Sequence, residues 1–322
     1  MSEPTQKEIS IPWPGKSAIA VTLTIPPDTV ERSGYGLLLG PGAGGDEKTA
    51  LLTAVANEVA RHGHFCARYR AKVPNLGFRV SLCTRVVEHL FHPATGVHPL
   101  KGCFLGGHSM GTRVAGTVAA QLAAKDPTST TDTSSSAPAK KTAAKGKKAT
   151  PSKKSASAAA APSDFPPNYI SGLIFFSYPL HTADNTKALR DQILYDIPST
   201  TPTLFISGLK DTMCQPTLLA KVFKDMKASP REVVQVSDAD HGLGFGSSKP
   251  AQGKKEALID AISEWTMQFM DEAITIVSKK SQGDGYEVED KAKTVKKSVA
   301  VTKKAELKKM ADEWTVAVST VA

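Results

Sequence analysis

Short, continuously apolar runs alternate with segments whose apolar residues recur at helical spacing. A run without polar alternation indicates a strand that is buried on both faces of a sheet. We expect such strands at residues 36–40, 64–69, 102–107, 170–178, 203–208 and 232–236. We expect helices at residues 49–62, 78–90, 110–124, 185–195, 216–227 and 254–279. Strands separated by helices predict an α/β fold, with a mostly parallel, doubly wound sheet covered by helices on both faces.

Three segments depart from this pattern. Residues 9–25 alternate apolar and polar positions and are interrupted by prolines, which predicts an antiparallel edge of the sheet. Residues 127–163 are almost entirely Ser, Thr, Ala, Lys and Pro, which predicts a disordered insertion. Because the strand–helix pattern continues after it, we expect one domain over residues 1–278, which should fold without residues 128–162. Residues 279–322 predict a polar basic tail with a short helix near residues 304–316.

The net charge of +9 is concentrated in the insertion and the tail. Residues 127–163 hold seven Lys and one Asp, and residues 279–322 hold ten Lys and seven acidic residues, whereas the rest of the chain carries 23 basic and 23 acidic residues. A neutral body argues against a nucleic-acid-binding fold. The lysines of the insertion fit a solvated linker, a nuclear-import signal or a weak, sequence-blind contact with polyanions. A protein partner that binds the insertion or the tail stays open.

Targeting and metal-binding signals are missing from the sequence. The first ten residues lack the basic and apolar regions of a signal peptide, and no apolar run is long enough to span a bilayer. The four cysteines show no CxxC spacing, which favours reduced thiols over disulfides or a zinc site. We therefore expect a protein of the cytoplasm or the nucleus, with no metal, no cofactor and no membrane contact.

The segment FLGGHSMGTR, residues 104–113, carries the strongest chemical signal. It contains the G-x-S-x-G pattern at Gly107, Ser109 and Gly111, between a predicted strand and a predicted helix. That context is typical of a nucleophile elbow, a strained turn that exposes the serine hydroxyl, and glycines flank it because a Cβ would clash there. The helix start also provides free N–H groups for a developing oxyanion. Ser109 is therefore the candidate nucleophile.

A serine nucleophile needs a base, and the base needs an acid that orients it. Asp211 follows the strand at 203–208, and His241 follows the strand at 232–236, in the order Ser, Asp, His of α/β-hydrolases. Asp211 could instead cap the helix that begins near Pro216. Asp238 and Asp240 compete for the role of the acid, but they lie too close in sequence to His241 for the usual arrangement.

The loop GPGAGG, residues 40–45, follows the first parallel strand and is expected to complete the oxyanion hole. We assign the two N–H donors to Ala43 and Met110, and we expect Asp46 to cap the next helix. The same loop also matches the G-x-G-x-x-G fingerprint of dinucleotide-binding proteins. Acidic residues at the expected helix start, and the lack of an acidic residue after the next strand, argue against that alternative.

Several segments together resemble the α/β-hydrolase superfamily in its dienelactone-hydrolase-like branch. The chain is most similar to the testis-expressed protein 30 group, which includes a subunit of the NSL chromatin complex. The resemblance covers residues 34–275 without the insertion. It rests on LGPGAGGD (39–46), FLGGHSMGTR (104–113), GLIFFSYPLH (172–181), LRDQIL (189–194) and LFISGLKDTMC (204–214). This chain has His108 where the group commonly has Arg, which favours ordinary hydrolase chemistry, and Pro41 where the group has His.

These observations predict a serine hydrolase that cleaves an ester or a similar acyl bond in a small acyl substrate. His181 and His108 are weaker candidates for substrate binding, and loop carbonyls could equally satisfy His181. The alternative is a hydrolase-like interaction module with little or no activity, which the resemblance to a chromatin-complex subunit and the two basic segments support. The complete set of Ser109, Asp211 and His241 favours the enzyme.

Overall fold

The computed structural model describes residues 2–124, 165–166, 168–229, 231–281 and 316–321. The described strands form a nine-stranded sheet in the order β1-β2-β4-β3-β5-β6-β7-β8-β9. Its central strands are parallel, as predicted: β3 (Tyr35–Gly40), β4 (Phe65–Tyr69), β5 (Gly102–His108), β6 (Ile170–Phe176), β7 (Thr203–Gly208) and β8 (Arg231–Val236). Their carboxyl ends therefore share one edge of the sheet.

Antiparallel strands close both sides of this sheet. The predicted antiparallel edge consists of β1 (Thr5–Ile11) and β2 (Ile19–Ile25), and β2 pairs with β4. On the other side β9 (Val316–Val321) pairs with β8. Strand β9 has no counterpart among the elements predicted from the sequence, and the predicted tail helix runs to Val316, where this strand begins. The rest of that predicted helix, and the predicted insertion, lie outside the described residues.

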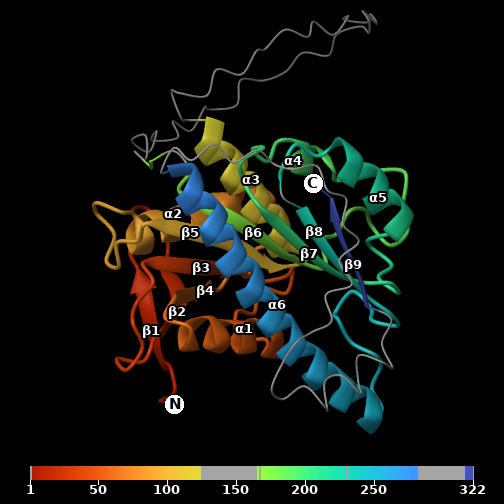
Figure 1. Cartoon of the computed structure of the whole chain (residues 1–322), viewed down its shortest axis with the longest axis horizontal. Coiled ribbons are helices and arrows are strands. Elements are labelled where there is room, and N and C mark those ends of the chain that lie inside the picture. The colour runs from red at the N-terminus through yellow and green to blue at the C-terminus, as the bar shows by residue number, and fades with distance from the viewer. Residues whose placement is uncertain (1, 125–164, 167, 230, 282–315, 322) are drawn as a thin grey trace, which may run out of the picture.

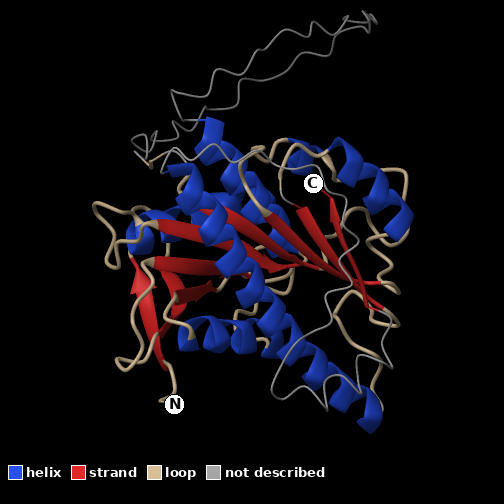
Figure 2. Cartoon of the chain, in the orientation of Figure 1, coloured by secondary structure: helices blue, strands red, loops and turns tan. Residues whose placement is uncertain are grey.

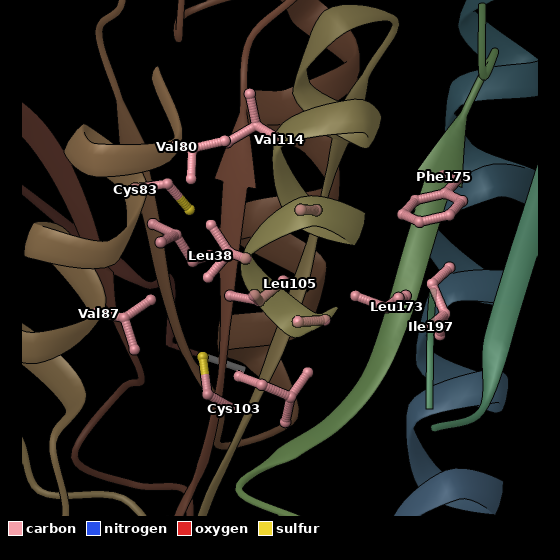
Figure 3. Packing of buried hydrophobic residues seen from close by; sticks show 14 of the residues in the cluster. Leu38, Val80, Cys83, Val87, Cys103, Leu105, Val114, Leu173, Phe175 and Ile197 are labelled. Atoms are coloured by element: carbon pink, nitrogen blue, oxygen red, sulfur yellow. The ribbon is translucent and has the colours of Figure 1, made fainter. Parts of the chain in front are cut away.

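Helices cover both faces of the sheet, which confirms the predicted doubly wound α/β arrangement (Figures 1 and 2). One buried cluster joins the sheet to α1 (Ala50–Arg61) and α6 (Lys249–Ser281). A second cluster joins the other face to α2 (Leu76–Phe91), α3 (Met110–Ala124), α4 (Gln192–Tyr195) and α5 (Pro216–Asp225). In Figure 3, Val80, Cys83 and Val87 of α2 lie beside Leu38 of β3.

The helix predicted at residues 185–195 is mostly absent, and only α4 remains of it. The side chain of Asn185 accepts hydrogen bonds from the N–H groups of Lys187 and Ala188, which forms a turn. The N–H group of Arg190 donates to the carbonyl of Leu180 at 2.7 Å. These partners lie outside a helical ladder, so the main chain follows a loop until α4 begins.

Among the described residues, no helix combines the length and the apolarity that crossing a bilayer requires. All four cysteines are buried thiols. Burial raises the pKa of Cys66 and Cys83 to about 12, because a thiolate would lose its hydration there.

Candidate functional site

Ser109 lies in a strained turn between β5 and α3, at the carboxyl edge of the parallel strands. Its φ angle is 51°, which is uncommon for a residue other than glycine. The N–H group of Ser109 donates to the carbonyl of Phe176 at 2.9 Å, and its own carbonyl accepts from the N–H and hydroxyl groups of Thr112. These bonds hold the turn in the geometry predicted for a nucleophile elbow.

The glycines around Ser109 allow the elbow to approach the loop after β3. A Cβ on Gly107 or on Gly111 would lie 2.1 Å from the carbonyl oxygen of Gly40, well inside van der Waals contact. No side chain larger than hydrogen fits at either position without moving the main chain. The spacing G-x-S-x-G is therefore explained by main-chain contacts with Gly40.

Of the three residues predicted to form a triad, His241 lies within hydrogen-bonding distance of both Ser109 and Asp211. The Nε2 atom of His241 lies 2.8 Å from Oγ of Ser109. The Nδ1 atom of His241 lies 2.9 Å and 3.0 Å from the two carboxylate oxygens of Asp211. The Asp211 side chain is fully buried, whereas the His241 side chain is 23% exposed. Solvent therefore reaches part of the His241 side chain, whereas the Asp211 carboxylate is shielded from it.

Asp211 does not cap the next helix. The residue at the N-cap of α5 is Gln215, and the Asp211 carboxylate instead accepts the N–H of Met213 at 2.7 Å. The two competing acids lie elsewhere: Asp238 pairs with Lys210 at the surface, and Asp240 accepts the N–H groups of two following glycines. Asp240 thereby shapes the loop that carries His241.

The loop after β3 lies beside the elbow, as the oxyanion assignment requires. A Cβ on Gly42 would lie 3.7 Å from Cβ of Ser109 and 3.0 Å from Nδ1 of His108. Met110 is the first residue of α3, and Ala43 is exposed. Within the described ranges, neither the N–H group of Ala43 nor that of Met110 donates to a main-chain carbonyl in a turn, loop or cap. Their assignment to the oxyanion hole stays a prediction.

The prediction that Asp46 caps α1 is wrong. The N-cap residue is Thr49, and the Asp46 carboxylate accepts the N–H of Lys48 in a turn before the helix. Helix α1 begins only at Ala50, so the glycines of residues 40–45 do not open directly into a helix. A dinucleotide fingerprint requires that direct entry to place a pyrophosphate on the helix N-terminus. The loop therefore lacks the geometry of the dinucleotide-binding alternative.

His108 connects the elbow to the loop that carries His241. Its Nε2 atom lies 2.9 Å from the carbonyl oxygen of His241, and the two rings lie 5.5 Å apart. Burial lowers the pKa of His108, because the charged imidazolium would lose its hydration. The neutral ring therefore carries its proton on Nε2, and this N–H donates a hydrogen bond to the carbonyl of His241.

His181 is completely buried, and both of its ring nitrogens have partners. The N–H group of Gln215 donates to Nε2 at 3.1 Å, so Nδ1 carries the proton and donates to the carbonyl of Thr182 at 2.9 Å. The main-chain N–H of His181 also donates to the carbonyl of Met213. The side chain thus contacts the loop that carries Asp211 and has no exposed surface for a substrate.

Arg79 is a residue of this site that the sequence analysis missed. Its side chain is fully buried on α2 and donates to carbonyls of the loop after β3. The signal in the sequence is its position in the apolar stripe of that helix, four residues before Cys83. A charged residue in such a stripe must find polar partners in the interior, which singles it out for attention.

Comparisons with known proteins agree with this architecture. A family described as "Alpha/beta hydrolase domain" matches residues 149–271, which include Asp211 and His241 but not Ser109. A dienelactone hydrolase from Anabaena variabilis aligns with a TM-score of 0.52 at 16% identity, covering 82% of this chain and 98% of that chain. Est1E from Butyrivibrio proteoclasticus aligns with a TM-score of 0.52 at 12% identity, covering 82% of this chain and 99% of that chain.

An alpha-beta serine hydrolase homologue from Coxiella burnetii is similar to the same extent. It aligns with a TM-score of 0.50 at 16% identity, covering 80% of this chain and 96% of that chain. At such identities the likeness concerns the arrangement of helices and strands. Together with the sheet order and the strand–turn–helix around Ser109, it leads to one structural conclusion. The chain has the α/β-hydrolase fold.

Proposed function

We propose that this protein is a serine hydrolase that cleaves an ester or a similarly activated acyl bond. The observation that supports this proposal is the continuous hydrogen-bonded chain from Ser109 through His241 to Asp211. A neutral imidazole bonded to a carboxylate through Nδ1 presents Nε2 as a base toward the serine hydroxyl. The buried carboxylate fixes this tautomer and stabilises the imidazolium that forms.

The reaction follows from this arrangement in two stages. Oγ of Ser109 attacks the acyl carbon while Nε2 of His241 takes the hydroxyl proton, and the carbonyl oxygen becomes an oxyanion near the N–H groups of Ala43 and Met110. When the bond to the leaving alcohol breaks, His241 returns the proton to that alcohol. Water then attacks the acyl-serine with His241 as base, which releases the carboxylic acid and restores Ser109.

The experiment that tests this proposal is labelling with a fluorophosphonate probe, combined with turnover of p-nitrophenyl esters of increasing acyl length. We expect the wild type to be labelled and Ser109→Ala not to be. Ser177→Ala is the matched control, because Ser177 also follows a parallel strand, is buried and has a positive φ angle of 52°. Absence of labelling of the folded wild type would sink the proposal.

We further propose that the chain belongs to the testis-expressed protein 30 group. Two of the segments that carry the resemblance, SYPLH and the DTMC ending, contact each other through the N–H of His181 and the carbonyl of Met213. A hydrolase-like interaction module is the alternative within this group. It predicts a folded protein that fails to react with the probe and binds a protein partner through one of the basic segments.

A further inference from the structure

Arg79 carries a buried positive charge without an acidic partner. It is among the largest side chains with essentially no exposed surface, and no carboxylate of the described residues forms an ion pair with it. Burial lowers its pKa, but an arginine side chain keeps its proton in proteins. A buried cation costs several kcal/mol unless hydrogen bonds replace its hydration.

Main-chain carbonyls provide that replacement. All three nitrogens of the Arg79 guanidinium donate to carbonyls of two loops that follow neighbouring strands, β3 and β4. These carbonyls belong to Pro41 at 3.2 Å, Gly42 at 2.7 Å, Ala43 at 2.9 Å, Val73 at 2.8 Å, and Ala71. Three consecutive carbonyls of the loop after β3 therefore point at one side chain.

This arrangement determines where the N–H groups of the same peptide units point. In a planar trans peptide, the C=O of one residue and the N–H of the next residue point in opposite directions. Because the carbonyl of Gly42 is bonded to Arg79, the N–H of Ala43 points away from the guanidinium. Gly42 itself lies next to Ser109. The Gly42 carbonyl also accepts the N–H of Gly45 at 3.0 Å, so Arg79 and this turn together fix the orientation of the peptide unit that supplies one proposed oxyanion donor.

We propose that Arg79 is a positioning residue for the oxyanion loop, which it holds by its carbonyls so that the Ala43 N–H stays directed to the reaction centre. This inference rests on the proposed hydrolase function and adds the device that organises one half of the oxyanion hole. Arginine suits the role because its rigid planar fork offers five donors, whereas lysine offers three from a single nitrogen.

The oxyanion exists only in the transition state and the tetrahedral intermediate, so a misplaced donor slows the chemical step and leaves ground-state binding unchanged. Arg79 variants should therefore have a lower kcat than the wild type and an unchanged KM. A trifluoromethyl ketone, whose adduct with serine places an oxyanion in the hole, should lose affinity in proportion to kcat. Loss of a side chain that only stabilised the fold would not lower kcat and the affinity for the trifluoromethyl ketone by the same factor.

The test compares Arg79→Lys and Arg79→Met with Arg85→Lys and Arg85→Met. Arg85 is the matched control, because it lies on the same helix and donates to a single carbonyl, that of Pro12 at 3.3 Å. With p-nitrophenyl acetate, Arg79→Lys should lower kcat by about 10- to 100-fold and leave KM within about twofold, since one oxyanion donor is worth a comparable factor. The Arg85 variants should match the wild type.

Hydrogen exchange gives a readout that does not depend on activity. In Arg79→Lys, amides of residues 40–47 should exchange about tenfold faster or more, while those of β5 stay unchanged. A folded Arg79→Lys with more than half of the wild-type kcat would overturn the proposal. Failure of both Arg79 variants to fold, while both Arg85 variants fold, would also overturn it, because the residue would then serve the fold itself.

If the wild type itself is inactive, the proposed function fails and the exchange measurement decides the role of Arg79. Faster exchange confined to residues 40–47 in Arg79→Lys supports the proposal that Arg79 holds this loop in place. Unchanged exchange there rejects it.

Discussion

The Nε2 atom of His108 donates a hydrogen bond of 2.9 Å to the main-chain carbonyl of His241. The residue immediately before Ser109 thus holds the main chain of the residue whose ring contacts the Ser109 hydroxyl. His108→Ala should lower kcat about tenfold, because the His241 loop loses one of the bonds that set the distance from Nε2 to Oγ. His108→Gln carries an N–H at a similar distance from the main chain and should restore part of the loss. Equal turnover by His108→Ala and the wild type would contradict this role.

His181 should affect turnover through the loop that carries Asp211. His181→Ala removes a fully buried ring, leaves the Gln215 N–H without its acceptor and takes from the Thr182 carbonyl one of its two donors, the other being the Asn185 N–H. The free energy of unfolding should therefore fall by about 2–4 kcal/mol. In the folded variant kcat should fall while KM stays within about twofold, because the ring has no surface for a substrate. A change in KM alone, measured on p-nitrophenyl esters, would instead support the prediction that His181 binds the substrate.

Two helical glycines should respond to alanine in opposite directions. Gly111→Ala should destabilise the protein by several kcal/mol, because its Cβ would meet the Gly40 carbonyl at 2.1 Å. Gly253 lies in α6 with no atom within 4 Å of a Cβ, so Gly253→Ala should stabilise the fold by about 0.5–1 kcal/mol through its higher helix propensity. Urea denaturation of the two variants checks both signs. A harmless Gly111→Ala would show that the elbow can move away from Gly40.

The stability of the protein should fall as the pH falls from 7 to 5, partly through His64. Burial lowers the pKa of His64 from 6.5 to about 4, and its Nδ1 lies 2.7 Å from the Ser33 hydroxyl. Between pH 4 and pH 6.5 the unfolded chain binds a proton at His64 that the folded chain does not. The contribution of His64 to the free energy of unfolding is therefore complete above pH 6.5 and is lost as the pH falls toward 4. Between pH 7 and 5 the wild type should lose about 1–2 kcal/mol more than His64→Gln.

The neighbouring His62 serves as a control of opposite sign. A hydrogen bond to Glu58 raises the pKa of His62, so its stabilising contribution is present at low pH and is lost as the pH rises. In His62→Gln the free energy of unfolding should therefore fall more steeply between pH 7 and pH 5 than in the wild type. If both variants show the wild-type slope in urea denaturation, neither histidine controls the acid sensitivity.

The strands and the order Ser109, Asp211, His241 could be predicted because their signals are local. A continuous apolar run and the glycines of a turn are visible within a few residues of sequence. The helix expected at 185–195 failed because the N–H of Arg190 bonds to Leu180, a contact that no periodicity reveals. Strand β9 was missed for a related reason, since its pairing with β8 joins segments about 80 residues apart in the sequence.

The wrong role predicted for Asp46 and the oversight of Arg79 have a common physical cause. Asp46 has the residue type of a helix cap, but the chain uses it in a turn before α1 begins. Arg79 has the residue type of a surface arginine, but its donors are directed at main-chain carbonyls of a loop more than 30 residues away. A side chain that binds the main chain leaves no complementary residue type in the sequence, so pattern analysis cannot identify its partner.

The hydrogen bond between Ser109 and His241 joins residues 132 positions apart. Between them the chain must add β6, β7 and β8 to the sheet, so no early intermediate that lacks these strands can contain the assembled site. Contacts of such sequence separation form slowly, because the chain entropy of closing long loops is lost before the contact forms. During refolding, reactivity toward a serine-directed probe should consequently appear after most of the helical signal has returned. The reactivity of Ser109 thus reports when β6, β7 and β8 have joined the sheet.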